Sequence, residues 1–473
     1  MVPVTQTERG PTGGWAELLG PKHLGASTVL AGGVALYATN EFLTISLLPS
    51  TVADIGGGRL YAWVTTVYLV ASVVAATTVS SLLTKLGPRW AYLSGLGVFG
   101  IGSVLCAVAP TMEFLLLGRV VQGAAGGMLA GLGYAVINSA LPQSLWTKAS
   151  ALVSAMWGVG TLVGPAAGGL FAQFGSWRWA FGVLAVSTAV MAALVPFALP
   201  GREADAHRAL PDRIPVWSLV LLGAAALAVS VAGIQRNVGV TAALLAGGVA
   251  LVAVFLVVDR RTTASVLPPK AFRPGPLKWI YVTLGLLMAA TMADMYVPLF
   301  GQRLAHLVPV AAGFLSVSLA VGWTISEIVS ASLTKIRTTV LVVAVAPLVM
   351  AVGLGIAAAS QLEDAPVVVI AVWVVALMIT GTGVGIAWPH LSAWAMGSSD
   401  DPAEGRTAAA AINTVQLICG AFGAGLAGIV VNLTDRGDAT AARWLFAVMA
   451  VLAAAGVFAS YRAGRGALPT DAD

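Results

Sequence analysis

Long apolar runs recur along this chain, and they constrain its fold more than any other feature. A helix of about 20 apolar residues rises about 30 Å, which is the thickness of the hydrocarbon core of a bilayer. Only 10% of the residues are charged, whereas soluble domains carry roughly 25%. The sequence therefore predicts an all-α integral membrane protein with 14 spans. These spans lie near residues 26–50, 60–83, 90–109, 112–140, 149–174, 178–199, 216–233, 239–258, 277–300, 309–334, 338–358, 366–394, 407–432 and 441–461.

The predicted spans fall into groups of six, two and six. The two groups of six resemble repeats, because the similar segments Ser81–Arg89 and Ser332–Arg337 close the second span of each group. Two such bundles rocking about a site in the middle of the membrane are typical of secondary transporters. We predict a tail, a six-helix bundle, a loop with two additional helices, a second six-helix bundle and another tail, in residues 1–25, 26–199, 200–275, 276–463 and 464–473.

The distribution of Lys and Arg predicts that both termini lie in the cytoplasm. In that orientation 18 of the 25 basic residues lie inside and six lie outside, as the positive-inside rule requires. Residues 1–25 lack the apolar stretch and cleavage site of a signal peptide, so the first span is expected to be retained. Arginine outnumbers lysine 19 to 6, which hints at a high-GC bacterial genome. We therefore expect a multi-pass protein of the bacterial inner (plasma) membrane.

A glycine-rich stretch marks the fifth span. Gly160, Gly164 and Gly168 recur every four residues and lie along one helical face. Another helix can approach such a face backbone to backbone. Pro165 removes one helical hydrogen bond, so a bend is expected there. The stretch fits a plain packing surface, and it also fits a gating interface or pivot that includes Pro165 and Gly169. The same spacing recurs in the second half at Gly420, Ala424 and Gly428.

Four segments give the chain a resemblance to a known family. Gly160–Gly169 resembles the fifth-helix signature GxxxGPxxGG, and Leu117–Gly127 resembles the fourth-helix signature RxxQGxGG. Ser176–Phe181 and Leu267–Phe272 resemble the segments that lead into two later helices of that family. The chain thus resembles major facilitator superfamily transporters, specifically their fourteen-helix drug:proton antiporter branch. The resemblance implies proton-coupled efflux of amphipathic or hydrophobic small molecules, such as drugs, by alternating access.

Two regions depart from the family pattern. In the cytoplasmic loop after the second span, Lys85, Gly87 and Arg89 occupy motif positions, but Thr84 stands where the family has an aspartate. That aspartate helps to latch the inner gate, so the resemblance implies that this gate closes in another way. In the first span, Glu41 is displaced by one residue from the family's acid, and such a shift turns a side chain by about 100°.

Four charged residues stand well inside predicted spans: Glu41, Arg119, Asp294 and Glu327. A charge in the middle of a bilayer costs on the order of 3 kcal/mol, so each of them is a candidate for function. We predict that all four serve proton coupling, and a structural ion pair is the alternative for each. Glu41 and Arg119 lie at similar depths and could pair with each other, and Glu327 could pair with Arg406.

Polar and aromatic residues within the spans are candidates for a substrate cavity. Amides can line a cavity or join helices, and aromatic rings suit an apolar pocket. A place in the core or against lipid is the plainer alternative for any one of them. The predicted cavity residues are Asn40, Gln122, Tyr296, Trp323, Trp388, Asn413 and Gln416. We expect His390 to pack between helices, and Pro298 and Gly301 predict a break near the outer end of their helix.

Several classes of function are not expected. The chain has no GxxxxGKS or GxxxxGKT motif, which argues against ATP-driven export. It has no His–Cys cluster, so we predict no metal, no other cofactor and no enzyme activity. The expected partners are a small amphipathic substrate, protons and membrane lipids, without nucleic acid, and the expected state is a monomer. Two alternatives stay open: an exporter of a lipid or cell-envelope precursor, and a membrane receptor or scaffold that no longer transports.

Overall fold

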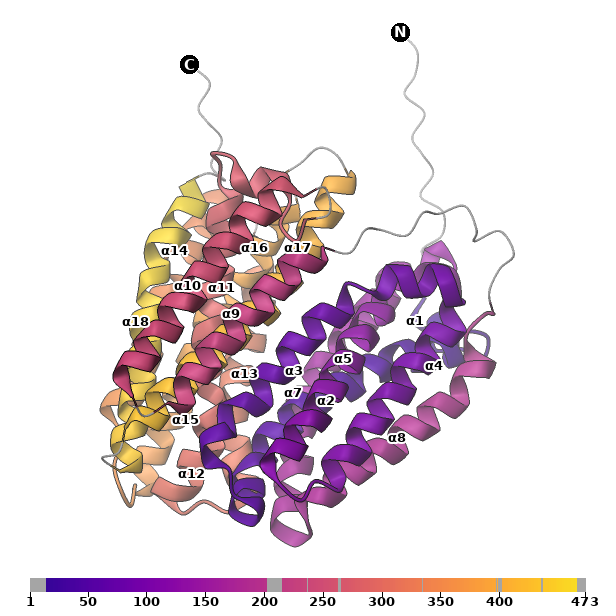
Figure 1. Cartoon of the computed structure of the whole chain (residues 1–473). Helices are drawn as coiled ribbons and strands as arrows, with labels where there is room; N and C mark the ends of the chain where they lie inside the picture. The colour runs from indigo at the N-terminus through magenta and orange to yellow at the C-terminus, as the bar shows by residue number, and fades with distance from the viewer. Residues whose placement is uncertain are drawn as a thin grey trace, which may run out of the picture.

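Helices make up the regular structure of the computed structural model, which shows two bundles side by side (Figure 1). It describes residues 14–201, 215–235, 237–262, 265–333, 335–396, 398, 402–434 and 437–465. The first bundle contains α2 (Leu24–Ile55), α3 (Tyr61–Ala76), α4 (Val79–Ala107), α5 (Met112–Ala135), α7 (Trp146–Phe174) and α8 (Trp177–Ala198). Four short elements accompany it: α1 (Trp15–Leu18), η1 (Gly58–Leu60), α6 (Ile137–Ala140) and η2 (Gln143–Leu145).

The second half of the chain begins with the two additional helices. These are α9 (Val216–Ile234) and α10 (Val238–Arg261), and the turn η4 (Pro269–Phe272) connects them to the second bundle. That bundle contains α11 (Leu277–Thr291), η5 (Met292–Tyr296), α12 (Val297–Ala305), α13 (Pro309–Ala331), α14 (Ile336–Ala359), α15 (Val367–Gly385), α16 (Trp388–Met396), α17 (Pro402–Leu433) and α18 (Asp438–Arg465).

Thirteen of the described helices are long and apolar enough to cross a membrane, and α2 is the remaining long one. Its 32 residues extend about 48 Å at 1.5 Å per residue. Asn40, Glu41 and Thr44 lower its hydropathy, and α2 packs along α7, α8 and α5. Asn40 and Thr44 are buried there, so neighbouring helices separate these polar groups from lipid. With α2 included, the described chain has the predicted arrangement of six, two and six.

Capping side chains and glycines set several helix boundaries. Thr111, Ser176 and Asn237 accept hydrogen bonds from first-turn amides at the starts of α5, α8 and α10. Such caps satisfy amides that have no partner within the helix. After α2, Gly56 and Gly57 have φ angles of 74° and 77°, a region that favours glycine. They turn the chain back toward α3.

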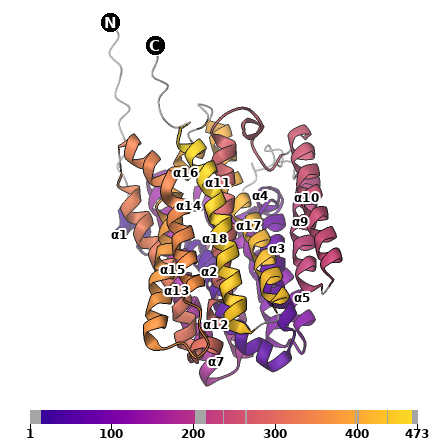
Figure 2. The ribbon, with the colours of Figure 1, turned by 90° about the vertical axis from the view of Figure 1, so that its left-hand side faces the viewer.

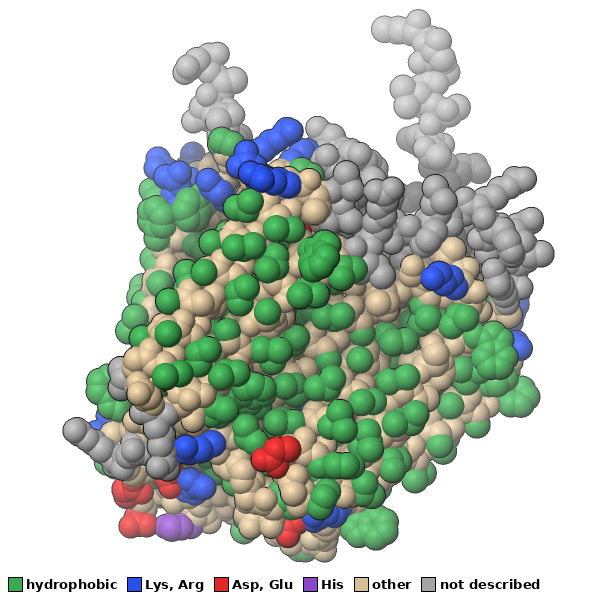
Figure 3. Space-filling model, viewed as in Figure 1, with side chains coloured by type: hydrophobic (Ala, Val, Ile, Leu, Met, Phe, Trp, Pro, Cys, Tyr) green, Lys and Arg blue, Asp and Glu red, His purple; other side chains and the backbone are tan. Residues whose placement is uncertain are grey.

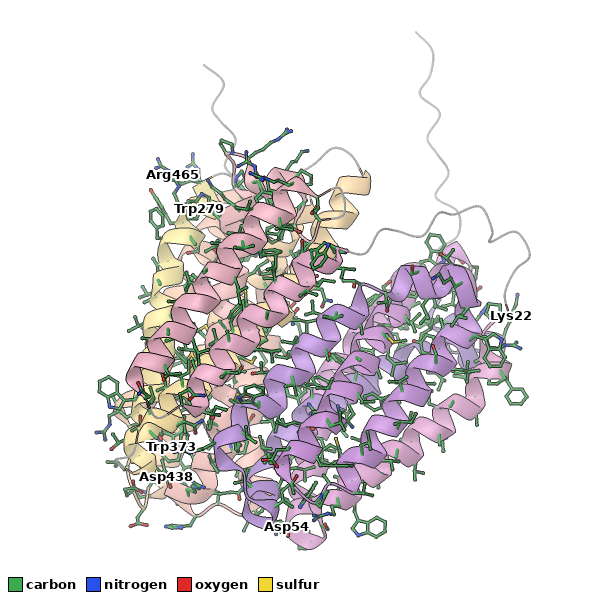
Figure 4. All side chains as sticks on the ribbon, viewed as in Figure 1. Lys22, Asp54, Trp279, Trp373, Asp438 and Arg465 are labelled. Carbon is green, nitrogen blue, oxygen red and sulfur yellow. The ribbon has the colours of Figure 1, made fainter. Side chains whose placement is uncertain are left out.

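Charged side chains gather at the two ends of the molecule, and a broad hydrophobic band lies between them (Figure 3). Figure 4 labels Lys22 and Arg465 at one end, and Asp54 and Asp438 at the other. We call the first the terminal end, because the described chain begins and finishes there, and the second the opposite end. The band between them is the surface expected to face lipid.

The two bundles meet at the opposite end, and their ribbons diverge toward the terminal end (Figure 1). The hydroxyl of Tyr61 donates to the carbonyl of Met295 at 3.1 Å, and the rings of Tyr61 and Tyr296 stack with centroids 4.7 Å apart. The side-chain amide of Asn432 donates to the carbonyl of Arg59 at 3.0 Å. Each contact joins the first bundle to the second, so the opposite end is closed.

The two additional helices lie against the junction of the bundles. α9 packs against α3 of the first bundle and α17 of the second, and α10 packs against α9. Figure 2 shows the pair at the right-hand edge of the molecule, with α13 and α15 at the left-hand edge. The additional helices therefore cover one side of the junction.

Candidate transport site

The three-glycine face of α7 packs against α2 of the same bundle. A Cβ at Gly160 would lie 2.5 Å from the Cβ of Ala38, and a Cβ at Gly164 would lie 2.9 Å from the amide nitrogen of Leu43. A Cβ at Gly168 would lie 2.7 Å from the carbonyl oxygen of Leu43. Since no side chain fits at these distances, α2 and α7 meet backbone to backbone. These glycines hold two helices of one bundle together.

The neighbouring face of α7 meets the second bundle. A Cβ at Gly169 would lie 2.5 Å from the Cα of Val310, in the first turn of α13. A Cβ at Gly313 would lie 3.0 Å from the carbonyl oxygen of Pro165. Ser46 of α2 donates to the same carbonyl at 3.3 Å. α7 continues as one helix through Pro165, so Pro165 and Gly169 together form a contact between the bundles near the opposite end.

Helix α17 has the same two kinds of face. A Cβ at Gly423 would lie 2.6 Å from the Cα of Ala289 on α11, within the second bundle. A Cβ at Gly428 would lie 2.7 Å from the Cβ of Ala62 on α3, in the first bundle. Gly420 also faces α3, where its Cβ would lie 3.2 Å from Leu69. One face of α17 therefore packs within its bundle and the next face packs across the junction.

The internal repeat is therefore offset by one residue from the predicted alignment of α17 with α7. Gly420, Ala424 and Gly428 match the face of α7 that carries Pro165 and Gly169, and not the three-glycine face. Residues four apart drift by about 40° around a helix, so adjacent rows of small residues fit the same pattern. Spacing alone therefore cannot tell which row meets which neighbour.

Arg119 is 1% exposed and is surrounded by neutral groups. Its guanidinium donates to the side-chain oxygens of Gln122 at 2.9 Å and Asn40 at 3.3 Å, and to the carbonyl of Val64 at 3.3 Å. It also lies over the ring of Tyr68, 4.0 Å from the centroid, where the face of the ring attracts a cation. None of the salt bridges among the described residues includes Arg119. Within the described part of the chain, its charge thus has no carboxylate bound to it.

Glu41 follows Asn40 on α2 and is half-buried. Its Oε2 atom is buried and has no hydrogen-bond partner. The described residues form no salt bridge between Glu41 and Arg119. Arg119 donates instead to Asn40, the residue before Glu41 on α2. An unpaired charged oxygen inside a membrane protein is costly, and protonation removes that charge.

Asp294 lies where the regular helix is interrupted. The 3₁₀ turn Met292–Tyr296 separates α11 from α12. The break is thus at Asp294 itself, earlier than the predicted position near Pro298 and Gly301, because proline is tolerated in the first turn of α12. Ser316 of α13 donates to Asp294 Oδ2 at 2.8 Å, and Oδ1 is buried without a partner. Short 3₁₀ segments within helices often mark hinges.

Tyr296 belongs to the closed end of the junction. It is 1% exposed, and its hydroxyl has no hydrogen-bond partner. Tyr61 and Tyr296 line a cavity of about 380 Å³, together with Arg59 and Arg303. This cavity opens at the opposite end, between α2, α12, α17 and α18.

Glu327, Trp323 and Trp388 form a cluster between α13 and α16. The indole of Trp323 donates to Glu327 Oε2 at 2.9 Å, and the rings of Trp323 and Trp388 have centroids 5.5 Å apart. In the part of the chain that the structure describes, no cation forms a salt bridge with Glu327. The side chain of Arg406, its predicted alternative partner, lies outside the described residues.

Asn413 and Gln416 face the junction on α17. Asn413 is exposed and Gln416 is half-buried. They precede Gly420 by seven and four residues, and helical spacing places all three on one face. Because Gly420 approaches Leu69 of α3, both amides point toward the first bundle, nearer the terminal end.

The loop residues tie α4 to α8. Lys85 is exposed, and Gly87 has φ 74° and ψ 171°, which interrupts the helical path of α4. Arg89 donates through two nitrogens to the carbonyl of Leu199, at 3.2 and 3.1 Å. This carbonyl lies just beyond α8, where a basic side chain satisfies a group that the helix leaves without a partner. These loop contacts thus lie within the first bundle.

The described residues contain no group of three side chains suited to hold a metal. His390, on α16, hydrogen-bonds instead with Ser330 of α13 at 2.9 Å. Cys106 is buried, and its thiol contacts Gln122 at 3.4 Å. His390 and Cys106 thus serve contacts between helices.

Asp259 is a buried carboxylate that the sequence analysis does not single out. It accepts hydrogen bonds from the Ser218 hydroxyl at 2.7 Å and from the amides of Val266 and Leu267 at 2.7 and 2.9 Å. It thereby joins α10 to α9 and to the segment before the second bundle. An acid at the end of a span normally lies in water, so its position gave no sign of this burial.

Comparison with known proteins identifies the family. Residues 30–424 match the Major Facilitator Superfamily. The chain belongs to this superfamily. A protein of Mycobacterium tuberculosis named "Probable multidrug-efflux transporter" is 64% identical over 458 residues, which cover 96% of this chain and 97% of that protein. The superfamily member described here is therefore a transporter and not an enzyme, and it is a multi-pass bacterial membrane protein.

Two solved structures share the superfamily fold. A bacterial homolog to the human lysosomal transporter Spinster, in an inward-facing and unoccupied conformation, has a TM-score of 0.65 and 11% identity, with 94% of this chain and 98% of that chain covered. A D-xylose–proton symporter has a TM-score of 0.63 and 14% identity, with 92% and 97% covered. At these identities the likeness concerns the fold alone.

Proposed function

We propose that this transporter exports amphipathic or hydrophobic small molecules in exchange for protons, by alternating access. The name of the M. tuberculosis relative supports efflux of such molecules. Proton coupling rests on one observation: Glu41 and Asp294 each keep a buried carboxyl oxygen without a hydrogen-bond partner. These two residues lie on α2 and directly after α11, which are the first membrane-crossing elements of the two bundles.

A proton changes both sites in the same way. A charged carboxylate without a full set of partners is costly inside the membrane, and a neutral carboxyl is much less so. When Glu41 is charged, Arg119 is a cation available to it, because the described groups that bind the guanidinium are neutral. Proton and guanidinium then compete for the carboxylate. This competition would couple the charge of Glu41 to the packing of α2 against α5.

The transport cycle follows from the shape of the junction. The ribbons of the bundles meet at the opposite end and diverge toward the terminal end (Figure 1), which the distribution of Lys and Arg predicts to face the cytoplasm. Substrate would bind between the bundles from that side. Separation of the contacts at Pro165 and Gly169 would then open the other end, where protons enter and displace the substrate. The membrane potential supplies about 2.3 kcal/mol per proton for each 100 mV.

Proton movement in proteoliposomes tests this proposal. An imposed gradient of ethidium should drive counterflow of protons, reported by an enclosed pH-sensitive dye. Glu41→Gln keeps the shape of the side chain and removes its charge, and it should abolish the proton signal. Glu113→Gln is the control, because Glu113 is an exposed carboxyl in the first turn of α5, and it should leave the signal unchanged. Undiminished proton counterflow in Glu41→Gln would exclude Glu41 as the coupling site.

A further inference from the structure

The bundles meet along two seams, one between α3 and α17 and the other between α7 and α13. The additional helices close the first of these. In this seam, where α3 meets α17, the indole of Trp63 donates to the carbonyl of Ser230 on α9 at 2.9 Å. The hydroxyl of Ser230 donates to that of Thr66 on α3 at 3.2 Å. On the other side, a Cβ at Gly425 of α17 would lie 3.0 Å from the Ser230 hydroxyl. α9 therefore contacts both bundles.

Apolar packing extends this closure toward the terminal end. One buried cluster joins α3, α9 and α17 through Leu69, Val73, Leu219, Leu222, Leu417 and Ile418, and it extends to Tyr37 of α2 and Phe255 of α10. The hydrogen bonds of Asp259 fix the end of α10 to α9 and to the following segment. The α3–α17 seam is therefore filled by side chains along much of its length.

Among the described residues, the close contacts of the second seam, between α7 and α13, lie near the opposite end. There Pro165 contacts Gly313. Gly158 lies seven residues before Pro165, so it is on the same face, about 10 Å nearer the terminal end. Gly158 is exposed, and a Cβ built on it would meet no atom within 4 Å. α9 and α10 lie at the other edge of the molecule (Figure 2), so this part of the seam has no cover from them.

Helical spacing relates Glu327 to the face of α13 that meets α7. It follows Gly313 by 14 residues, which places it within about 40° of the same face and about 21 Å nearer the terminal end. It is half-buried beside the indoles of Trp323 and Trp388, and no described cation neutralises it. A carboxylate beside aromatic rings attracts an organic cation both by charge and by the faces of the rings.

We propose that substrates enter sideways from the membrane leaflet at the terminal end, through the seam between α7 and α13. Glu327, with Trp323 and Trp388, selects amphipathic organic cations at the mouth of this seam. The α9–α10 pair closes the other seam and makes access one-sided. This inference rests on the proposed export function, and it adds the substrate class and the route.

Binding to the purified transporter in lipid nanodiscs tests the substrate class. Tetraphenylphosphonium is the lipophilic cation and triphenylphosphine oxide its neutral counterpart. Glu327→Gln should weaken binding of the cation at least tenfold and leave binding of the neutral probe unchanged, and Glu327→Asp should retain most of the affinity for the cation. Equal affinity of the wild type and Glu327→Gln for the cation would overturn the selection, and so would a wild type that does not bind the cation.

The rate of cation binding tests the route. Gly158→Trp fills the open seam and should slow binding at least tenfold. Gly247→Trp is the matched control, because Gly247 on α10 is also exposed and also has open space around it, and it should bind at the wild-type rate. Gly158→Leu repeats the test if the tryptophan variant does not fold. Wild-type binding rates in the folded Gly158 variants would overturn the route. The proposed function has a separate test: it fails if an ethidium gradient moves no protons in proteoliposomes of the wild type.

Discussion

The two small-residue faces of α7 meet different neighbours, and the same is true of α17. On α7, Gly164 packs against α2 within one bundle, whereas Gly169 packs against α13 of the other. On α17, Gly423 packs against α11 of its own bundle and Gly428 against α3 of the other. The first kind of contact must persist in every state, and the second must separate when the opposite end opens. Similar residues thus serve stability on one face and conformational change on the next.

Charges do not join the bundles in the described part of the chain. The carboxylate of Asp54 on α2 pairs with Arg178 on α8, and Arg303 on α12 pairs with Asp438 on α18 at 2.9 Å. The remaining described pair also lies within the second bundle. Closure of the opposite end therefore depends on close packing and on hydrogen bonds between neutral groups. A transporter whose inner loop carries Thr84 in place of the family's aspartate would depend on such packing at its other gate as well.

The largest expected effect is on stability, from Gly164→Leu. A Cβ there would lie 2.7 Å from the Cβ of Phe42, and α2 and α7 cannot separate without opening their bundle. We expect a loss of about 3 kcal/mol, in the upper part of the range for overpacking. Thermal unfolding of the purified protein measures it. Gly158→Leu is the control on the same helix, since its side chain enters open space. Equal melting temperatures for the two variants would show that the contact of Gly164 with α2 does not matter for stability.

A smaller energetic effect, but a larger conformational one, is expected from Gly169→Leu. The clash with Val310 is relieved when the bundles separate, so the free energy of unfolding should fall by no more than about 1.4 kcal/mol, which is less than in Gly164→Leu. The opposite end should open more often. Ser46 is buried at this contact. In a Ser46→Cys background, a thiol reagent should label this cysteine about tenfold faster, which corresponds to about 1.4 kcal/mol. Gly182→Leu on α8 should not change the labelling, and an unchanged rate in Gly169→Leu would contradict the account.

The smallest effect is expected from Asp54→Asn. Its ion pair with Arg178 lies within the first bundle, and the two side chains are 50% and 35% exposed. Exposed pairs contribute little to stability, so the melting temperature should fall only slightly. Labelling of Ser46→Cys should stay at its original rate. Faster labelling would show that this ion pair takes part in closure, and that charge as well as packing keeps the opposite end closed.

Much of the fold could be predicted from the sequence, because apolar length and periodicity determine which segments cross a membrane. Details within the spans could not. The four-residue spacing of small residues did not reveal which face of α17 meets α3. The break before α12 fell at Asp294, since Pro298 fits the first turn of a helix. The partners of Arg119 are neutral groups brought together from α2, α3 and α5, and no local pattern encodes such contacts.

The most direct measurement compares two disulfides on α17. A Cβ at Gly285 would lie 3.6 Å from the Cβ of the native Cys419, which suits a disulfide, so Gly285→Cys should join α11 and α17 within one bundle. Ala62→Cys with Gly428→Cys, in a Cys419→Ser background, should join α3 and α17 across the junction. The two Cβ positions are only 2.7 Å apart, so these helices must move apart by about 1 Å for the disulfide to form. Oxidation of the second pair should stop ethidium transport, and a reductant should restore it, whereas the first disulfide should leave transport near its original rate. Transport that continues with the bundles joined by the second disulfide would contradict the account.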